Sequence, residues 1–233
     1  MKKFIKISSI VLGVLIVGIF IASRFDNKVK YYVNLGFEYV KHIKGVRVPE
    51  EYSKVDKNNN GTPDCLDIVT AARKEAENKT VYKDAYYKGG YPPDSEGVCT
   101  DVIWRGLKSI DVDLKALVDK DIQENLKAYP RVSDKPDKNI DFRRVKNLDV
   151  FLKRNADSIT KELKPFEADN LKEWQPGDFV IIMKPFEHIA VISDVRDRDG
   201  VPKVIHNTSP HAVENSRLSY WAPYIYGHYR WKY

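Results

Sequence analysis

The sequence of 233 residues has no internal repeat, no low-complexity segment and no block of basic residues interleaved with aromatic ones. The last of these absences argues against a nucleic-acid partner, although the formal net charge is +6. Half of that charge comes from Lys2, Lys3 and Lys6, which precede the first apolar run. With 42% hydrophobic residues the chain can form a core, which argues against a disordered protein.

Charged residues are also missing from Ile7 to Ser23, directly after the basic start of the chain. A basic segment followed by an apolar one is typical of exported proteins. The run of roughly 17 residues is near the lower limit for a membrane-spanning helix, and it lacks a clean Ala-x-Ala cleavage site. We predict that residues 1–23 anchor the chain in a membrane, with a cleaved signal peptide as the alternative. Both place the rest of the chain outside the cytoplasm, anchored or secreted to the cell wall.

Cysteine is scarce, and the only two are Cys65 and Cys99. In an exported chain two cysteines often form a disulfide, so this pairing is an alternative to any chemistry at either residue. A redox protein that uses both thiols would need their Cα atoms less than ~7 Å apart.

Hydrophobic periodicity predicts helices first and strands later. The helices are expected at 28–44, about 64–78, from Cys99 to Leu107, and at 145–163. Four apolar runs at 179–183, 188–193, 201–206 and 224–231 read as strands of a sheet covered on both faces. This order predicts an α+β fold with helices packed on a small antiparallel sheet. The expected parts are residues 1–23, a helical arm and linker at 24–63, and a domain at 64–233.

Cys99 follows a Gly-bearing loop and begins an apolar helical pattern, so we place it in the first turn of a helix. Unpaired backbone N–H groups and the helix dipole stabilise an anion at that position. A thiol there loses its proton more easily, and the same N–H groups can hold an oxyanion during acyl transfer. A small buried core residue is the plain alternative.

Two histidines lie at the ends of neighbouring predicted strands. His188 opens one strand, His206 closes the next, and the turn around Asp197–Gly200 would bring them together. His188 is the candidate general base for Cys99. Either His206 or Asn207 would orient its ring, because neighbouring side chains on a strand point to opposite faces.

This order of motifs resembles the NlpC-type cysteine peptidases of the cell wall. The likeness is carried by Cys99 at a helix start, Trp174–Asp178, His188–Ser193 and Val204–His206. It implies a papain-like fold and a catalytic Cys99, His188 and His206. In these peptidases a cleft tyrosine precedes the cysteine, which makes Tyr91 a candidate for supporting the oxyanion.

The sequence is more closely similar to a YijF-like family of exported bacterial proteins, classed as a domain of unknown function. The likeness covers roughly residues 64–233 and is carried by Gly89–Pro93, Gly97–Val102, Asn139–Val145 and Gly227–Arg230. Thr100 and Asp101 stand where many NlpC-type peptidases have Ser-Gly. Asp101 is expected to pair bidentately with Arg143 or Arg144.

A twelve-residue segment starting at Asp56 has the oxygen spacing of a calcium loop. Gly61 occupies position 6, where EF-hand and dockerin-type loops turn sharply. Positions 1, 3, 5, 7, 9 and 12 are Asp56, Asn58, Asn60, Thr62 (through its carbonyl), Asp64 and Asp67. We predict weak, structural Ca²⁺ binding and no organic cofactor. An Asn- and Gly-rich linker with a helix cap is the alternative.

Together these features predict an extracytoplasmic, bacterial cysteine hydrolase that cleaves amide bonds in peptidoglycan. Its expected partners are the cell wall and, through the N-terminal segment, a membrane. Two alternatives keep the same fold. One is a non-catalytic wall-binding or scaffold module, and the other is a lipid thioesterase or acyltransferase.

Overall fold

The computed structural model describes residues 45–132 and 135–233, together with the isolated residues Ile19, Lys30, Val33, Gly36, Val40, Ile43 and Lys44. The predicted anchor at 1–23 and the predicted helix at 28–44 therefore lie almost entirely outside the described residues. Within the described part, no helix is long and apolar enough to cross a membrane. The chain divides into Met1–Val46 and a compact unit, Arg47–Tyr233, which contains every feature discussed below.

The helices of this unit follow the predicted apolar stripes. α3 (Asp64–Glu77) and α4 (Cys99–Lys108) confirm the helices expected at about 64–78 and from Cys99. The predicted helix at 145–163 is too long, because α6 (Val145–Asn155) ends where Asp157–Ser158 pairs with the last strand as β3. The other α-helices among the described residues are α5 (Leu114–Glu124), α7 (Ala168–Leu171) and α8 (Arg217–Trp221), and three short 3-10 helices, Leu126–Ala128, Asp141–Arg143 and Ala222–Tyr224, join them.

Six strands form one antiparallel sheet in the order β3-β8-β4-β5-β6-β7. Four of them, β4 (Phe179–Ile182), β5 (His188–Arg196), β6 (Pro202–Asn207) and β8 (Ile225–Arg230), confirm the predicted runs. β7 (Ala212–Asn215) extends the sheet beyond β6. A separate parallel pair, β1 (Val81–Tyr82) and β2 (Glu96–Gly97), precedes α4. The fold is thus α+β, as predicted.

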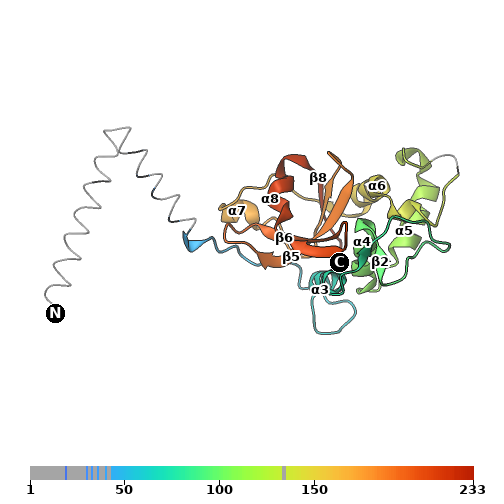
Figure 1. Ribbon diagram of the computed structural model, residues 1–233, viewed down its shortest axis with the longest axis horizontal. Helices are drawn as coiled ribbons and strands as arrows, with labels where there is room; N and C mark the ends of the chain where they lie inside the picture. The colour runs from blue at the N-terminus through green and yellow to red at the C-terminus, as the bar shows by residue number, and fades with distance from the viewer. Residues whose placement is uncertain are drawn as a thin grey trace. The chain divides into compact units, whose positions relative to one another are not determined.

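Side-chain alternation sorts the sheet into two buried faces. Ile189, Val191 and Ile205 point into the main core, which they share with Val102 and Leu107 of α4. Figure 1 shows α4, α5 and α6 grouped beside the strands, with α3 below α4 in this view. The other face is covered by α8, which packs against β6. This sandwiching explains why the central strands are apolar on both sides.

Candidate active site

His188 and His206 meet across β5 and β6. Val191 pairs with Ile205 in the antiparallel register, so His206 shares a sheet face with Ala190 and His188. The Nε2 atom of His188 lies 2.8 Å from Nδ1 of His206, a hydrogen bond between the two rings. Of the two residues considered at the end of β6, His206 is therefore the one that meets His188.

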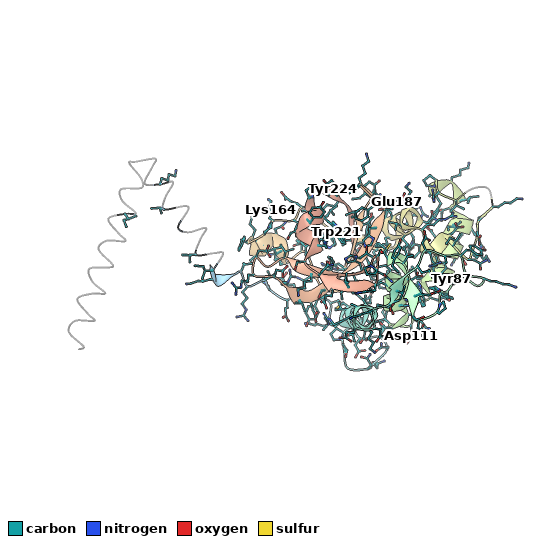
Figure 2. All side chains as sticks on the ribbon, in the orientation of Figure 1. Tyr87, Asp111, Lys164, Glu187, Trp221 and Tyr224 are labelled. Carbon is teal, nitrogen blue, oxygen red and sulfur yellow. The ribbon has the colours of Figure 1, made fainter. Side chains whose placement is uncertain are left out.

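The histidine pair is enclosed by aromatic side chains. Trp221, labelled in Figure 2 at the end of α8, has its ring centroid 5.3 Å from His188 and 5.0 Å from His206. Phe186, in the turn before β5, lies edge-on to His188 at 5.8 Å. Burial lowers the pKa of His188 to about 3 and that of His206 to about 4, so both rings are neutral at pH 7.

Cys99 begins α4, as predicted, and its side chain is only 7% exposed. Backbone N–H groups of Ile189, Thr100 and Cys99 itself act on the thiol, and each of them lowers its pKa. Burial outweighs them and raises the pKa of Cys99 to about 11. In this conformation Cys99 is a neutral thiol at pH 7, although the neighbouring backbone N–H groups would stabilise its thiolate.

The Cys99 thiol lies near the backbone of Ile189, the second residue of β5. It is therefore near the start of this strand, where His188 is the first residue. Among the described residues no hydrogen bond joins the Cys99 thiol to the His188 ring. The structure thus brings the two histidines into contact and places Cys99 against the adjacent backbone. Both cysteines are free, so the alternative of a Cys65–Cys99 disulfide is wrong.

A buried ion pair fixes the first turn of α4. Asp101 accepts hydrogen bonds from Nε and Nη2 of Arg143, both at 2.8 Å, which confirms the expected bidentate pair. Its carboxylate also accepts from the backbone N–H of Val98 at 2.7 Å and from the indole of Trp104 at 2.8 Å. A Cβ at Gly97 would stand 2.9 Å from Asp101 Oδ2, so only glycine leaves room for this carboxylate. Asp101 therefore holds the loop that leads into Cys99.

The remaining candidates lie on both sides of α4. Asn207 donates from Nδ2 to the carbonyl of Gly97 at 3.1 Å, which ties the end of β6 to the loop before Cys99. Tyr91 packs 4.7 Å from the ring of Trp104, donates to Asp113 and lines a cavity of about 480 Å³ beside the second half of α4. Its proposed role at the oxyanion stays a prediction.

Tyr82 was missed by sequence reasoning. Burial, and after it the negative charge that the Cys99 thiolate would carry, raises the pKa of the Tyr82 phenol. The side chain is more than one-third exposed and belongs to the two-residue strand β1. No periodicity or motif marks so short a strand, so only the tertiary structure could show that Tyr82 and Cys99 interact electrostatically.

The predicted calcium loop has a compact network of its own. Asp56 accepts from the backbone N–H of Asn60 at 3.1 Å and of Gly61 at 2.9 Å, and Gly61 has a φ of +88°. The amides of Asn58 and Asn60 both donate to Oδ2 of Asp67, at 3.2 and 2.8 Å. Side chains of positions 1, 3, 5 and 12 therefore face a common interior.

Two predicted ligands are placed differently. Thr62 donates its backbone N–H to Oδ1 of Asn60 at 2.8 Å, and Asp64 accepts from the backbone N–H of Lys57 at 3.1 Å. No group of three or more His, Cys, Asp or Glu side chains is gathered for metal binding in the part of the chain that is described. An ion here would depend on amide and main-chain oxygens as well as carboxylates.

The raised pKa of Cys99 predicts slow alkylation. Only the thiolate reacts, so a shift from 9.0 to about 11 should make iodoacetamide modification at pH 7 about 100-fold slower than at an ordinary cysteine. The rate should rise about tenfold per pH unit up to pH 10. Mass spectrometry can follow Cys99, with Cys65, whose thiol pKa burial also raises to about 11, as the internal comparison. A rate that is already maximal near pH 7 would show a thiolate–imidazolium pair instead.

Comparison with known proteins places the chain in a family. The model of a domain of unknown function, DUF1287, matches residues 69–231, so the chain belongs to this family. The protein named "Uncharacterized protein YijF" from Escherichia coli strain K12 is 36% identical over 197 residues, which cover 81% of this chain and 90% of that protein. The resemblance to a YijF-like family is confirmed, whereas neither finding concerns NlpC-type peptidases, a ligand or an activity.

Proposed function

We propose that the protein is an extracytoplasmic cysteine hydrolase of papain-like, NlpC-type architecture that cleaves amide bonds in peptidoglycan. The observation that carries this proposal is the His188–His206 hydrogen bond of 2.8 Å at the strand start where the Cys99 thiol meets the backbone of Ile189. The basic and apolar start of the sequence supports an anchored or secreted protein that works at the cell wall.

The chemistry follows from the groups around the thiol. Nε2 of His188 is taken by His206, so Nδ1 is the nitrogen left to accept the Cys99 proton. The resulting thiolate attacks an amide carbonyl, and His188 returns the proton to the leaving amine. Backbone N–H groups at the start of α4 donate to the oxyanion that forms on the carbonyl oxygen. Water then releases the acyl group from Cys99.

The first turn of α4 must stay rigid for this chemistry, because the donors have to point at the reacting carbonyl. Asp101 and Arg143 provide that rigidity from within the core. The aromatic cover must open, since Cys99 and His188 are both more than nine-tenths buried. Burial raises the pKa of Cys99 to about 11 and lowers that of His188 to about 3, which opposes proton transfer between them. Entry of a polar substrate would relieve this burial and bring the two pKa values closer together.

The test is digestion of purified sacculi by the full-length protein and by Cys99→Ser, analysed by mass spectrometry. New muropeptides from the wild type alone are expected, and their masses identify the bond. Absence of products from the wild type, or equal products from Cys99→Ser, would contradict the proposal.

Burial of the thiol favours a second candidate, a non-catalytic module that binds the cell wall. A cysteine with a pKa of about 11 has very little thiolate at neutral pH. This candidate predicts that the protein sediments with intact sacculi, that Cys99→Ser binds equally well, and that no muropeptide is released by either.

We further propose that the loop at 56–67 binds Ca²⁺ with a structural role. Its fit rests on the donor set: carboxylates of Asp56 and Asp67 and the amides of Asn58 and Asn60 face one interior. The backbone N–H of Asp64 donates to the carbonyl of Val55 at 2.8 Å, so the loop is closed at the start of α3. Bound calcium would hold the segment before the loop to this helix.

Calcium at 10 mM should raise the free energy of unfolding by about 1–3 kcal/mol, the value for a site with a Kd of roughly 0.1–1 mM. The thermal midpoint with CaCl₂ and with MgCl₂ measures it. Asp56→Ala should abolish the calcium-dependent part, while Asp111→Ala, a change at an exposed aspartate outside the loop, should keep it. Equal midpoints with and without calcium would rule the site out.

A further inference from the structure

The hydrogen bond between His188 and His206 can be made in two ways. Both rings are neutral at pH 7, so their shared contact holds one proton, on Nε2 of His188 or on Nδ1 of His206. If His206 is the donor, the proton of His188 is on Nδ1, and this ring cannot accept a proton there. Only the arrangement with His188 as donor leaves Nδ1 free as a base.

The far side of His206 decides between the two arrangements. Its Nε2 atom is buried and has no hydrogen-bond partner among the described residues. Two polar side chains act on this ring besides His188: Asn215 raises the pKa of His206, which burial lowers, and the positive charge of Arg217 lowers it further. Since Nδ1 is taken by His188, Nε2 is the ring nitrogen left for Asn215.

The register of β7 explains this approach. His206 pairs with Val213 and Val204 pairs with Asn215, so Asn215 lies diagonally across from His206 on the same face of the sheet. The backbone N–H of Arg217 donates to Oδ1 of Asn215 at 3.2 Å, which holds the oxygen of this amide in place. A carbonyl oxygen has a second lone pair available for a donor.

We propose that Asn215 is a positioning residue that fixes the tautomers of both histidines. Its Oδ1 accepts a hydrogen bond from Nε2–H of His206, which leaves Nδ1 of His206 unprotonated and able to accept a hydrogen bond. His188 then donates from Nε2 to that acceptor and keeps Nδ1 without a proton. The catalytic meaning of this arrangement rests on the proposed function, whereas the tautomers themselves do not.

Proton transfer is balanced in this scheme. The S–H bond of Cys99 breaks, the proton forms a new bond to Nδ1 of His188, and the ring becomes an imidazolium. His188 keeps its Nε2 proton throughout, and neither His206 nor Asn215 gains or loses one. The chain of hydrogen bonds from Asn215 to His188 therefore stays intact while the proton moves.

The test is ¹⁵N NMR of the histidine rings in the full-length protein at pH 7, because protonated and bare ring nitrogens differ strongly in chemical shift. We expect Nε2–H on both His188 and His206 in the wild type. Asn215→Leu should move both rings toward Nδ1–H and slow iodoacetamide modification of Cys99 about tenfold, the effect of one hydrogen bond. Asn215→Asp, which keeps an acceptor, should retain the Nε2–H forms.

Asn155→Leu makes the same chemical change at an exposed amide on α6 and should alter neither signal. Nδ1–H on both rings of the wild type, or unchanged tautomers in Asn215→Leu, would overturn the proposal. The sacculus digest is independent of this result. Expected tautomers without released muropeptides would support the role of Asn215 and contradict the hydrolase.

Discussion

Alanine in place of His188 should slow the proposed Cys99-dependent cleavage of peptidoglycan by about 10²- to 10⁴-fold, the contribution of a positioned general base. The thiol alone has a pKa of about 11, so without a proton acceptor very few molecules carry the nucleophilic thiolate at pH 7. The rate of muropeptide release from sacculi measures the effect.

His211→Ala is the matched control. His211 is half-buried, precedes β7 and hydrogen-bonds to the carbonyl of Ala212 rather than to the pair. It should retain the wild-type rate, and near-UV circular dichroism should show that both variants are folded. A His188→Ala protein that cleaves sacculi at the wild-type rate would remove His188 from the reaction.

The sequence predicted those helices and strands that are long enough to show hydrophobic periodicity. Apolar periodicity located α3, the start of α4 at Cys99 and the four long strands, because each has enough residues to show its period. The turn at Asp197–Gly200 then placed His188 and His206 in register. The Asp101–Arg143 pair was predicted from charge alone, while the choice between Arg143 and Arg144 required the structure, in which Arg144 pairs with Asp141 at 3.0 Å.

The residues around the site that the sequence did not predict lie on short secondary-structure elements. Tyr82, Asn215 and Trp221 lie on β1, β7 and α8, which have two, four and five residues. Such elements are too short to show a period, and their positions are set by tertiary packing against longer ones. The burial of Cys99 stood only as an alternative in the sequence, and the structure decides it through the strands β5 and β6, which lie far away in the chain.

Alanine in place of Asp101 should lower the free energy of unfolding by about 3–5 kcal/mol, because it leaves the Arg143 guanidinium buried without its partner. The side chains of Arg143 and Asp101 are 1% and 0% exposed, so water cannot replace the lost carboxylate. The change also removes the acceptor for the backbone N–H of Val98 and for the Trp104 indole. Urea denaturation followed by fluorescence gives the difference.

Two further variants separate the ion pair from general effects of substitution. Asp101→Leu combined with Arg143→Met removes both charges and should recover most of the lost stability, since an apolar pair avoids burying an unpaired charge. Glu124→Ala breaks the exposed pair with Lys120, whose side chains are 60% and 72% exposed, and should change stability by less than about 0.5 kcal/mol. If Asp101→Ala were as stable as Glu124→Ala, the first turn of α4 would not depend on this carboxylate, and Cys99 would have to be held by the packing of Val102 and Leu107 alone.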